Sequence, residues 1–273
     1  TLWTIGSRMS VRLIGIISMV ILARLLDPED YGLVAKAVMI QTFLLAVTEL
    51  GLESALITNQ KATKGHYNTA WTIHIIRGAI LGIILGALAI PAANYLNDPR
   101  LVNIIYCYAI ITFFKGFYNI GVVDFRKDMT FSYDFYYHLY QKVFAFVVTI
   151  TVAYIWQTYW ALVAGVATAL VVSLISSFWM SPYRPRFTFI EWKSLFNFSK
   201  WLLSYELIGA VSSGVDTFLL SHYSTTQNVG IYTVANEISG MPSTEVAMPV
   251  GRACAPGFAK LNHDREKFSE MYL

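Results

Sequence analysis

The chain has 273 residues, of which 56% are hydrophobic and 14% are charged, and its formal net charge is +3 at pH 7. Soluble globular proteins carry charge on roughly a quarter of their residues, so the composition excludes that class and indicates a protein with several membrane spans. The two cysteines, Cys107 and Cys254, lie in apolar stretches without a CxxC pattern. We therefore expect no disulfide framework, no metal site and no cofactor, and the small net charge gives no reason to expect a nucleic-acid partner.

The beginning of the chain predicts a helical hairpin. From Val11 to Ile40 two apolar helices are expected, because the turn from Asp27 to Asp30 interrupts a long hydrophobic run that resumes at Gly32. A bilayer span needs about 20 residues, which places Arg12 inside the hydrocarbon and Arg8 at its edge. An arginine at that depth has to face protein or water rather than lipid. The first apolar segment leads directly into further spans and lacks a small-residue cleavage site, so no cleavable signal peptide is expected.

Hydropathy predicts six more spans, so the expected fold is an all-α polytopic membrane protein with eight transmembrane helices. These six spans run from Ala70 to Tyr95, Leu101 to Val123, His138 to Trp156, Tyr159 to Met180, Lys200 to Ser221 and Val229 to Pro256. Basic connections alternate with connections that hold little or no lysine or arginine. Because short basic loops stay in the cytoplasm, the charge pattern predicts that both ends of this sequence, including the N-terminus, are cytoplasmic.

The longest connection, residues 182–200, is the predicted boundary between two parts of the chain. Trp192, Leu195 and Phe196 fall on one helical face, which indicates a linker helix lying along the cytoplasmic interface. An ordinary loop with scattered aromatic residues is the alternative. Residues 1–181 would then form an N-terminal lobe of six helices, and residues 201–273 the first two helices of a C-terminal lobe.

A weak internal repeat supports this division. A shift of 198 residues aligns LARLLDPEDYGLVAKAVMI, which begins at Leu22, with LSHYSTTQNVGIYTVANEI, which begins at Leu220. Four of the nineteen positions are identical, among them Gly32 and Gly230. Six spans separate the copies, so the halves are expected to be parallel repeats about an axis normal to the membrane. The sequence thus looks like a truncated two-lobe exporter fold.

Several stretches carry a resemblance to a known family. LARLLDPEDYGL followed by ELGLESALI, then FYNIGVVDFRKDMTF, and finally LFNFSKWLLSYELIGAVSSGVDTFLLS resemble the Wzx-type polysaccharide flippases, especially their colanic-acid branch. These belong to the superfamily that also holds multidrug and toxin exporters. The similarity covers nearly the whole chain.

The resemblance implies a function in building cell-surface polysaccharide. Such a flippase alternates between inward-open and outward-open states and turns an undecaprenyl-pyrophosphate-linked oligosaccharide from the inner to the outer leaflet. The implied location is the bacterial cytoplasmic membrane. The implied partners are the lipid-linked oligosaccharide, the bilayer and polysaccharide polymerase or export machinery, with H+ or Na+ as candidate coupling ions.

Moving an anionic pyrophosphate through a bilayer requires a hydrated, cationic path, which makes basic residues at membrane depth the candidate substrate-binding residues. They are Arg8, Arg12, Arg77, Lys115, Lys142 and Arg252. Arg12, Arg77 and Lys115 lie deepest, and we expect them in a central cavity. For Arg8 and Lys142, anchoring at the cytoplasmic interface is the alternative reading, and for Arg252 both anchoring and phosphate capture stay open.

Carboxylates at membrane depth are the candidate coupling or gating residues. They are Asp216, Glu237, Glu245 and Glu49. The alternative for the first three is a local hydrogen bond to a neighbouring turn, or an ion pair with an N-terminal cation. For Glu49, which flanks Gly51 at the end of the second helix, ordinary interfacial solvation is the alternative to an inner gate.

Two other functions fit part of the pattern. A membrane glycan polymerase or ligase would act on the same substrates, but every connection here is short, whereas an enzyme of that kind is expected to carry a long loop with clustered catalytic groups. A drug–cation antiporter shares the broad fold, but the excess of arginine and lysine in the first lobe disfavours a cationic cargo. We therefore predict a transporter rather than an enzyme.

Overall fold

The computed structural model describes the backbone of residues 2–59, 61–128, 130–193, 195, 209 and 214–242. Side chains are described from residue 13 onward within these ranges, apart from residues 131, 241 and 242. The chain divides into two compact units, Thr1–Gly230 and Ile231–Leu273. The fold and the candidate site described below belong to the first unit.

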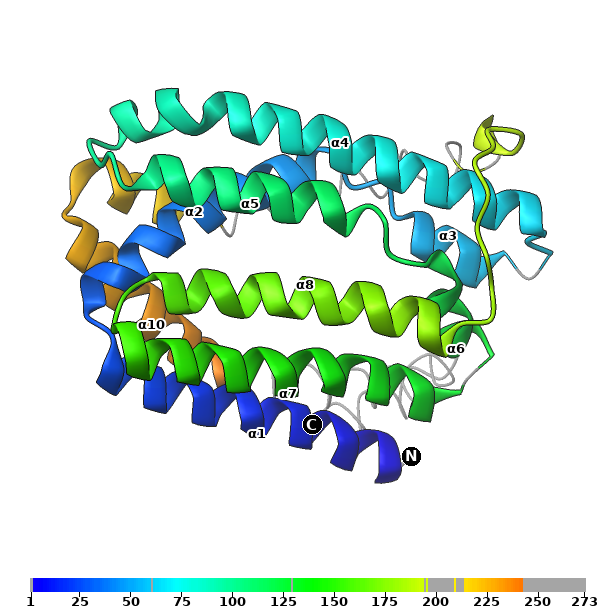
Figure 1. Cartoon of the computed structure of the whole chain (residues 1–273), viewed down its shortest axis with the longest axis horizontal. Coiled ribbons are helices and arrows are strands. Elements are labelled where there is room, and N and C mark those ends of the chain that lie inside the picture. The colour runs from blue at the N-terminus through cyan, green and yellow to red at the C-terminus, as the bar shows by residue number, and fades with distance from the viewer. Residues whose placement is uncertain are drawn as a thin grey trace, which may run out of the picture. The chain divides into compact units, whose positions relative to one another are not determined.

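Every regular element among the described residues is helical, which confirms the predicted all-α class (Figure 1). The elements are α1 (Leu2–Leu25), α2 (Pro28–Val47), α3 (Leu52–Thr58), α4 (Lys64–Tyr95), α5 (Leu101–Lys115), the 3-10 helix η1 (Ile120–Val123), α6 (Asp124–Lys127), α7 (Phe131–Trp156), α8 (Trp160–Met180) and α10 (Thr226–Pro242). Residues 214–223 are helical as well.

Four of these helices are long and apolar enough to cross a membrane, namely α2, α4, α7 and α8. The part of α1 whose side chains are described, Leu13–Leu25, is a shorter apolar helix. A fifth span is present if α5 and the η1–α6 pair count as one broken span. The prediction of a helical membrane protein is therefore confirmed. The spans predicted from Lys200 to Ser221 and from Val229 to Pro256 lie largely outside the described residues, so the count of eight stays a prediction.

The span predicted as continuous from Leu101 to Val123 is interrupted. Helix α5 ends at Lys115, and the chain turns by 75° before η1 and α6. At Gly116 the backbone passes so close to α4 that a Cβ atom would lie 2.6 Å from the His74 carbonyl oxygen. The Asn119 side chain then makes hydrogen bonds to the backbone in place of those within a helix. Its Oδ1 accepts from the Gly121 N–H at 2.9 Å, and its Nδ2 donates to a backbone carbonyl. These contacts between segments stop the helix where hydropathy alone continues it.

In the first unit, α4 packs along α5, α5 meets α8, α8 packs along α7, and α7 packs along α1 (Figure 1). The largest buried cluster lies where α2, α4 and α5 meet. Leu33 of α2, Leu85 of α4, and Leu101 and Tyr108 of α5 are each exposed by 2% or less. This cluster positions the ends of α2, α4 and α5 around the candidate site.

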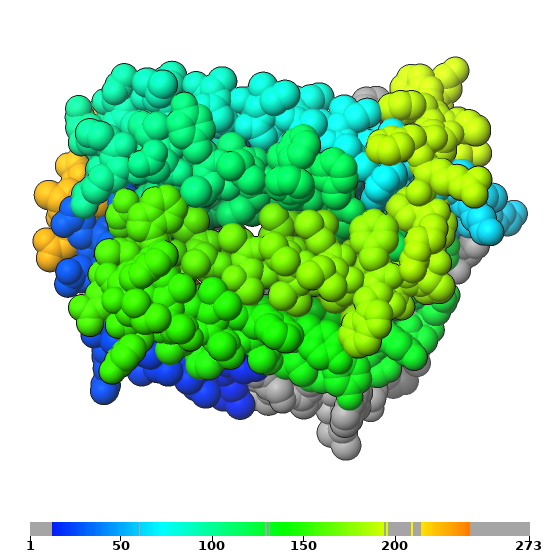
Figure 2. Space-filling view, in the orientation of Figure 1, coloured from blue at the N-terminus to red at the C-terminus, as the bar shows by residue number. Residues whose placement is uncertain are grey.

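The connection after α8 is described only in part over residues 182–200, so the linker helix stays a prediction. Its backbone forms neither helix nor strand from residue 181 to residue 189, and helical residues begin at Trp192. Polar side chains of α4 bind it: Asn68 Oδ1 accepts from the Arg186 N–H at 2.8 Å, and Thr72 Oγ1 accepts from the Thr188 N–H at 3.1 Å. The segment lies on the surface beside the first turns of α4 (Figure 2). Residues 194 and 196–200 are outside the described residues.

The predicted repeat is visible in the local structure. Helix α1 ends at Leu25 and α2 begins at Pro28, while the helix over residues 214–223 is followed by α10 from Thr226. Both pairs of boundaries are offset by the 198 residues that align the sequences. The last turns match too, since the Leu26 N–H donates to the Leu22 carbonyl at 2.9 Å and the Ser224 N–H donates to the Leu220 carbonyl at 3.0 Å.

Candidate functional site

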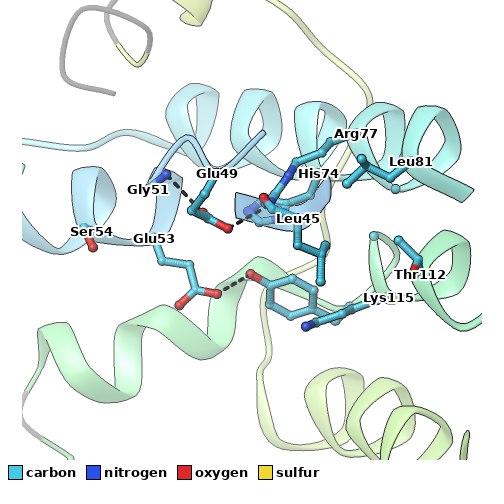
Figure 3. Close-up of a pocket in the computed structure, with 13 residues that line it drawn as sticks. Leu45, Glu49, Gly51, Glu53, Ser54, His74, Arg77, Leu81, Thr112 and Lys115 are labelled. Atoms are coloured by element: carbon cyan, nitrogen blue, oxygen red, sulfur yellow. Dashed lines mark hydrogen bonds and ion pairs between the residues drawn. The ribbon is translucent and has the colours of Figure 1, made fainter. Parts of the chain in front are cut away.

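A pocket of about 420 Å³ lies between the end of α2, α3, α4 and the end of α5 (Figure 3). We call it the Arg77 pocket. Its charged and titratable lining comes from Glu49, Glu53, His74, Arg77, Lys115 and Tyr118. Sequence reasoning named Arg77, Lys115 and Glu49 separately, and the structure brings these three into one pocket.

The Arg77 charge is already matched inside this pocket. Its Nη2 donates to Glu49 Oε2 and to the Leu45 carbonyl, both at 2.8 Å, and its Nε donates to Thr48 Oγ1 at 3.0 Å. The Arg77 side chain is only 14% exposed. The guanidinium therefore joins α4 to the end of α2. Its role as a cargo-binding cation stays a prediction that has to allow for this ion pair.

Glu53, which also lines the Arg77 pocket, is likewise bound by side chains of the protein. The Tyr118 hydroxyl donates to Glu53 Oε1 at 2.6 Å, and Arg126 Nη2 donates to Glu53 Oε2 at 2.8 Å. Burial raises the pKa of Glu53, but these two hydrogen bonds and the Arg126 charge outweigh it, so the net pKa lies below its ordinary value. The sequence also allowed an inner-gate role for Glu53, which flanks Gly51 like Glu49, but it did not reveal these partners, because they lie 65 and 73 residues away along the chain.

Two groups of the Arg77 pocket lack a partner among the described residues. Lys115 is exposed to the pocket, and its ammonium makes no ion pair or hydrogen bond with any described residue. His74 Nε2 is buried without a described hydrogen-bond partner, while its ring lies edge-on to the Tyr118 ring at 5.4 Å between centroids. Lys115 is therefore the lining cation that is available to a ligand.

A second pocket, of about 600 Å³, lies between α1, α7 and α8, and we call it the Lys142 pocket. One face of α7 supplies His138, Gln141, Lys142 and, two turns further on, Thr149. The rest of the lining is largely apolar and includes Leu22, Phe146, Leu162 and Val166. The pocket thus has a polar region with a cation and an apolar region along the same helices.

Lys142 reaches into this pocket beside α1. A Cβ atom at Gly15 would lie 4.0 Å from Lys142 Nζ, an ordinary contact distance, so the ammonium lies beside this turn of α1. Lys142 makes no ion pair with any residue that the structure describes, whereas the nearby His138 Nε2 lies 3.7 Å from Asp134 Oδ1. Lys142 therefore lines a pocket, and its role as a cavity cation or an interfacial anchor stays a prediction.

The other predicted site residues are not among those that line the two pockets. Arg8 and Arg12 lie on α1, but their side chains are outside the described residues, as are Glu245 and Arg252 entirely. Asp216 is exposed on the helix over residues 214–223, and Glu237 is exposed on α10. Within the described part of the chain, no group of three His, Cys, Asp or Glu side chains could hold a metal ion.

Lys36 is a buried cation that sequence reasoning overlooked. It is 2% exposed, and its Nζ donates to Thr226 Oγ1 at 2.8 Å. The signal was present in the sequence, since Lys36 interrupts the apolar run VAKAV in the middle of a predicted span.

Comparison with known proteins gives one family. The family model described as polysaccharide biosynthesis protein matches residues 21–273. The succinoglycan biosynthesis transport protein ExoT of Rhizobium meliloti (strain 1021) is 23% identical over 273 residues, which cover 99% of this chain and 55% of that protein. The teichuronic acid biosynthesis protein TuaB of Bacillus subtilis (strain 168) is 23% identical, with 99% of this chain and 57% of that protein covered.

The lipopolysaccharide biosynthesis protein WzxC of Escherichia coli (strain K12) is 21% identical over 262 residues, which cover 93% of this chain and 52% of that protein. The chain therefore spans about half the length of the curated relatives that it matches. No solved structure matches.

Proposed function

Because the chain belongs to the polysaccharide biosynthesis protein family, in line with its Wzx-type resemblance, we propose that it is part of a flippase for lipid-linked oligosaccharide. The cargo would be an oligosaccharide on undecaprenyl pyrophosphate, moved from the inner to the outer leaflet of the bacterial cytoplasmic membrane. The protein would work by alternating access between two lobes. Its partners would be polysaccharide polymerase or export machinery.

The observation that carries this proposal is the Lys142 pocket. A lipid-linked oligosaccharide combines an anionic diphosphate, polar sugars and an apolar chain, so its path needs a cation and polar groups beside an apolar wall. Lys142, Gln141 and His138 provide the first two, and Phe146, Val166 and their neighbours provide the third. At 4 Å and an effective dielectric constant of about 20, one lysine attracts one phosphate charge by about 4 kcal/mol before desolvation.

The Arg77 pocket supplies a second cation and argues against a positively charged cargo. Lys115 is available there, while the carboxylates of Glu49 and Glu53 already accept hydrogen bonds from Arg77, Tyr118 and Arg126. A cationic drug would need a carboxylate that is free to pair with it. Coupling to H+ or Na+ through Asp216, Glu237 or Glu245 belongs to the proposal as well.

The proposed function is tested with the full-length protein in proteoliposomes. Undecaprenyl-pyrophosphate oligosaccharide is placed in both leaflets, and the fraction reachable by a membrane-impermeant glycosidase is followed with and without a proton or sodium gradient. Protein-dependent movement across the bilayer is expected. Equal exchange in protein-free vesicles, or movement of a cationic dye instead of the lipid, would overturn the proposal.

A further inference from the structure

Helices α2 and α10 cross in backbone contact at two glycines. A Cβ atom on Gly32 would overlap the Thr226 carbonyl oxygen and would lie 2.9 Å from the Gly230 nitrogen. A Cβ atom on Gly230 would overlap the Pro28 carbonyl oxygen and would lie 2.8 Å from the Gly32 nitrogen. Real Cβ atoms do not come this close to backbone, so at both positions only glycine permits the crossing.

The two helices contact each other through residues that the repeat makes equivalent. The 198-residue offset relates Gly32 to Gly230 and Pro28 to Thr226. Gly32 therefore meets the counterpart of Pro28, and Gly230 meets Pro28 itself. Such a reciprocal contact is isologous, as at a two-fold axis between identical subunits. The local two-fold axis of the repeat thus passes between the two glycines.

A polar contact reinforces the crossing from one side. Lys36 lies one turn after Gly32 and is almost fully buried, and its ammonium donates to Thr226 Oγ1 at 2.8 Å. The repeat counterpart of Lys36 is Val234, so this bond has no symmetric copy. Loss of the hydroxyl partner would leave a buried ammonium without a hydrogen bond, at a cost in free energy. The bond therefore stabilises the closed crossing specifically.

We propose that the α2–α10 crossing is the outer closure of the transport path, which separates when the cargo leaves. This inference rests on the proposed function, in which the outer end has to open, and on the charge pattern, which puts the turns before both helices outside. At the two glycines the helices touch through backbone, so no interlocked side chains at these positions oppose their separation. Lys36 and Thr226 then set how readily it parts.

The test measures opening directly in the full-length protein. Cys107 and Cys254 are replaced by serine, and Val229→Cys is introduced, because Val229 is fully buried next to Gly230. A membrane-impermeant maleimide is added from the outside. Gly32→Ala is expected to raise the labelling rate on the order of tenfold, since the added methyl cannot fit the closed crossing. Gly86→Ala is the matched control, because a Cβ atom there meets nothing closer than 3.9 Å.

A second pair of variants leaves the glycines intact. Thr226→Val removes the hydroxyl that holds Lys36 and should raise labelling on the order of tenfold, whereas Thr226→Ser keeps it and should label like the parent. Unchanged labelling in both Gly32→Ala and Thr226→Val, or an equal rise in Gly86→Ala, would overturn the inference. A parent protein that moves no cargo would overturn the proposed function instead, while the labelling result would stand by itself.

Discussion

Arg77 Nη2 lies 2.8 Å from Glu49 Oε2, and this ion pair ties the middle of α4 to a residue two positions past the end of α2. The arginine is 14% exposed and the glutamate 36% exposed. A charge at this depth needs a partner, and here the partner belongs to the protein rather than to a ligand. The pair therefore shapes the Arg77 pocket and leaves Lys115 as its available cation.

Glu49→Gln is expected to destabilise the protein. It leaves the Arg77 charge without its carboxylate, at a cost of about 1 kcal/mol, the lower end of the usual range because water screens a glutamate that is 36% exposed. Thermal unfolding of the detergent-solubilised protein, followed by tryptophan fluorescence, measures the change. The double variant Glu49→Gln/Arg77→Met should recover part of the loss. An additive double variant would show that the two side chains do not interact.

Glu53 predicts a specific dependence of stability on pH. Its folded pKa lies below its ordinary value of 4.5, so its bonds to Tyr118 and Arg126 stabilise the fold above that value. This contribution is lost as the pH falls through the lower folded pKa. Glu53→Gln should therefore lower the unfolding temperature at pH 7 and have little effect at the acid end. A difference between parent and variant that grows toward low pH would contradict this.

Helices α7 and α8 approach closely at Gly165, where an added Cβ atom would overlap Thr149 Oγ1. Gly165→Ala should destabilise the protein by about 1–3 kcal/mol through overpacking. Thr149→Ala in the same chain removes the clashing hydroxyl and should restore part of the stability. The unfolding temperatures of the single and double variants measure both effects. An unchanged unfolding temperature in Gly165→Ala would show that the two helices are further apart.

The irregular segment after α8 depends on Asn68, which accepts hydrogen bonds from the Tyr183 hydroxyl at 2.5 Å and the Arg186 N–H at 2.8 Å. Asn68→Ala should release this segment, and limited trypsin digestion should then cut faster after Arg186, whereas Pro185 blocks cleavage after Arg184. Asn103→Ala, an exposed asparagine of α5, serves as the control. Equal digestion rates in the two variants would mean that other contacts hold the segment.

The sequence predicted the helical membrane class because hydrophobic runs of bilayer length have few other uses. It also located the turn before α2 and its repeat before α10, since Asp27-Pro28 and Thr225-Thr226 interrupt two apolar runs at equivalent places. It did not predict the end of α5 at Lys115. That break depends on Gly116 meeting the backbone of α4, a contact between segments that hydropathy does not register.

The candidate site was predicted less completely than the fold. Depth in a span made Arg77 look like a free cation, because a single sequence does not reveal that Glu49 lies beside it. Lys142 stayed open between a substrate-binding role and an anchor, since its distance from the helix start says nothing of the pocket between α1, α7 and α8. Lys36 was overlooked because its partner, Thr226, lies 190 residues away along the chain.

The central claim is that the ammonium in the Lys142 pocket holds the diphosphate of the cargo. The most direct measurement is the transport rate of undecaprenyl-pyrophosphate oligosaccharide in proteoliposomes, for the parent protein, Lys142→Met and Lys142→Arg at equal protein content. Loss of one charge contact should slow Lys142→Met by about tenfold, while Lys142→Arg should keep most of the rate. Transport by Lys142→Met at the parent rate would contradict the account.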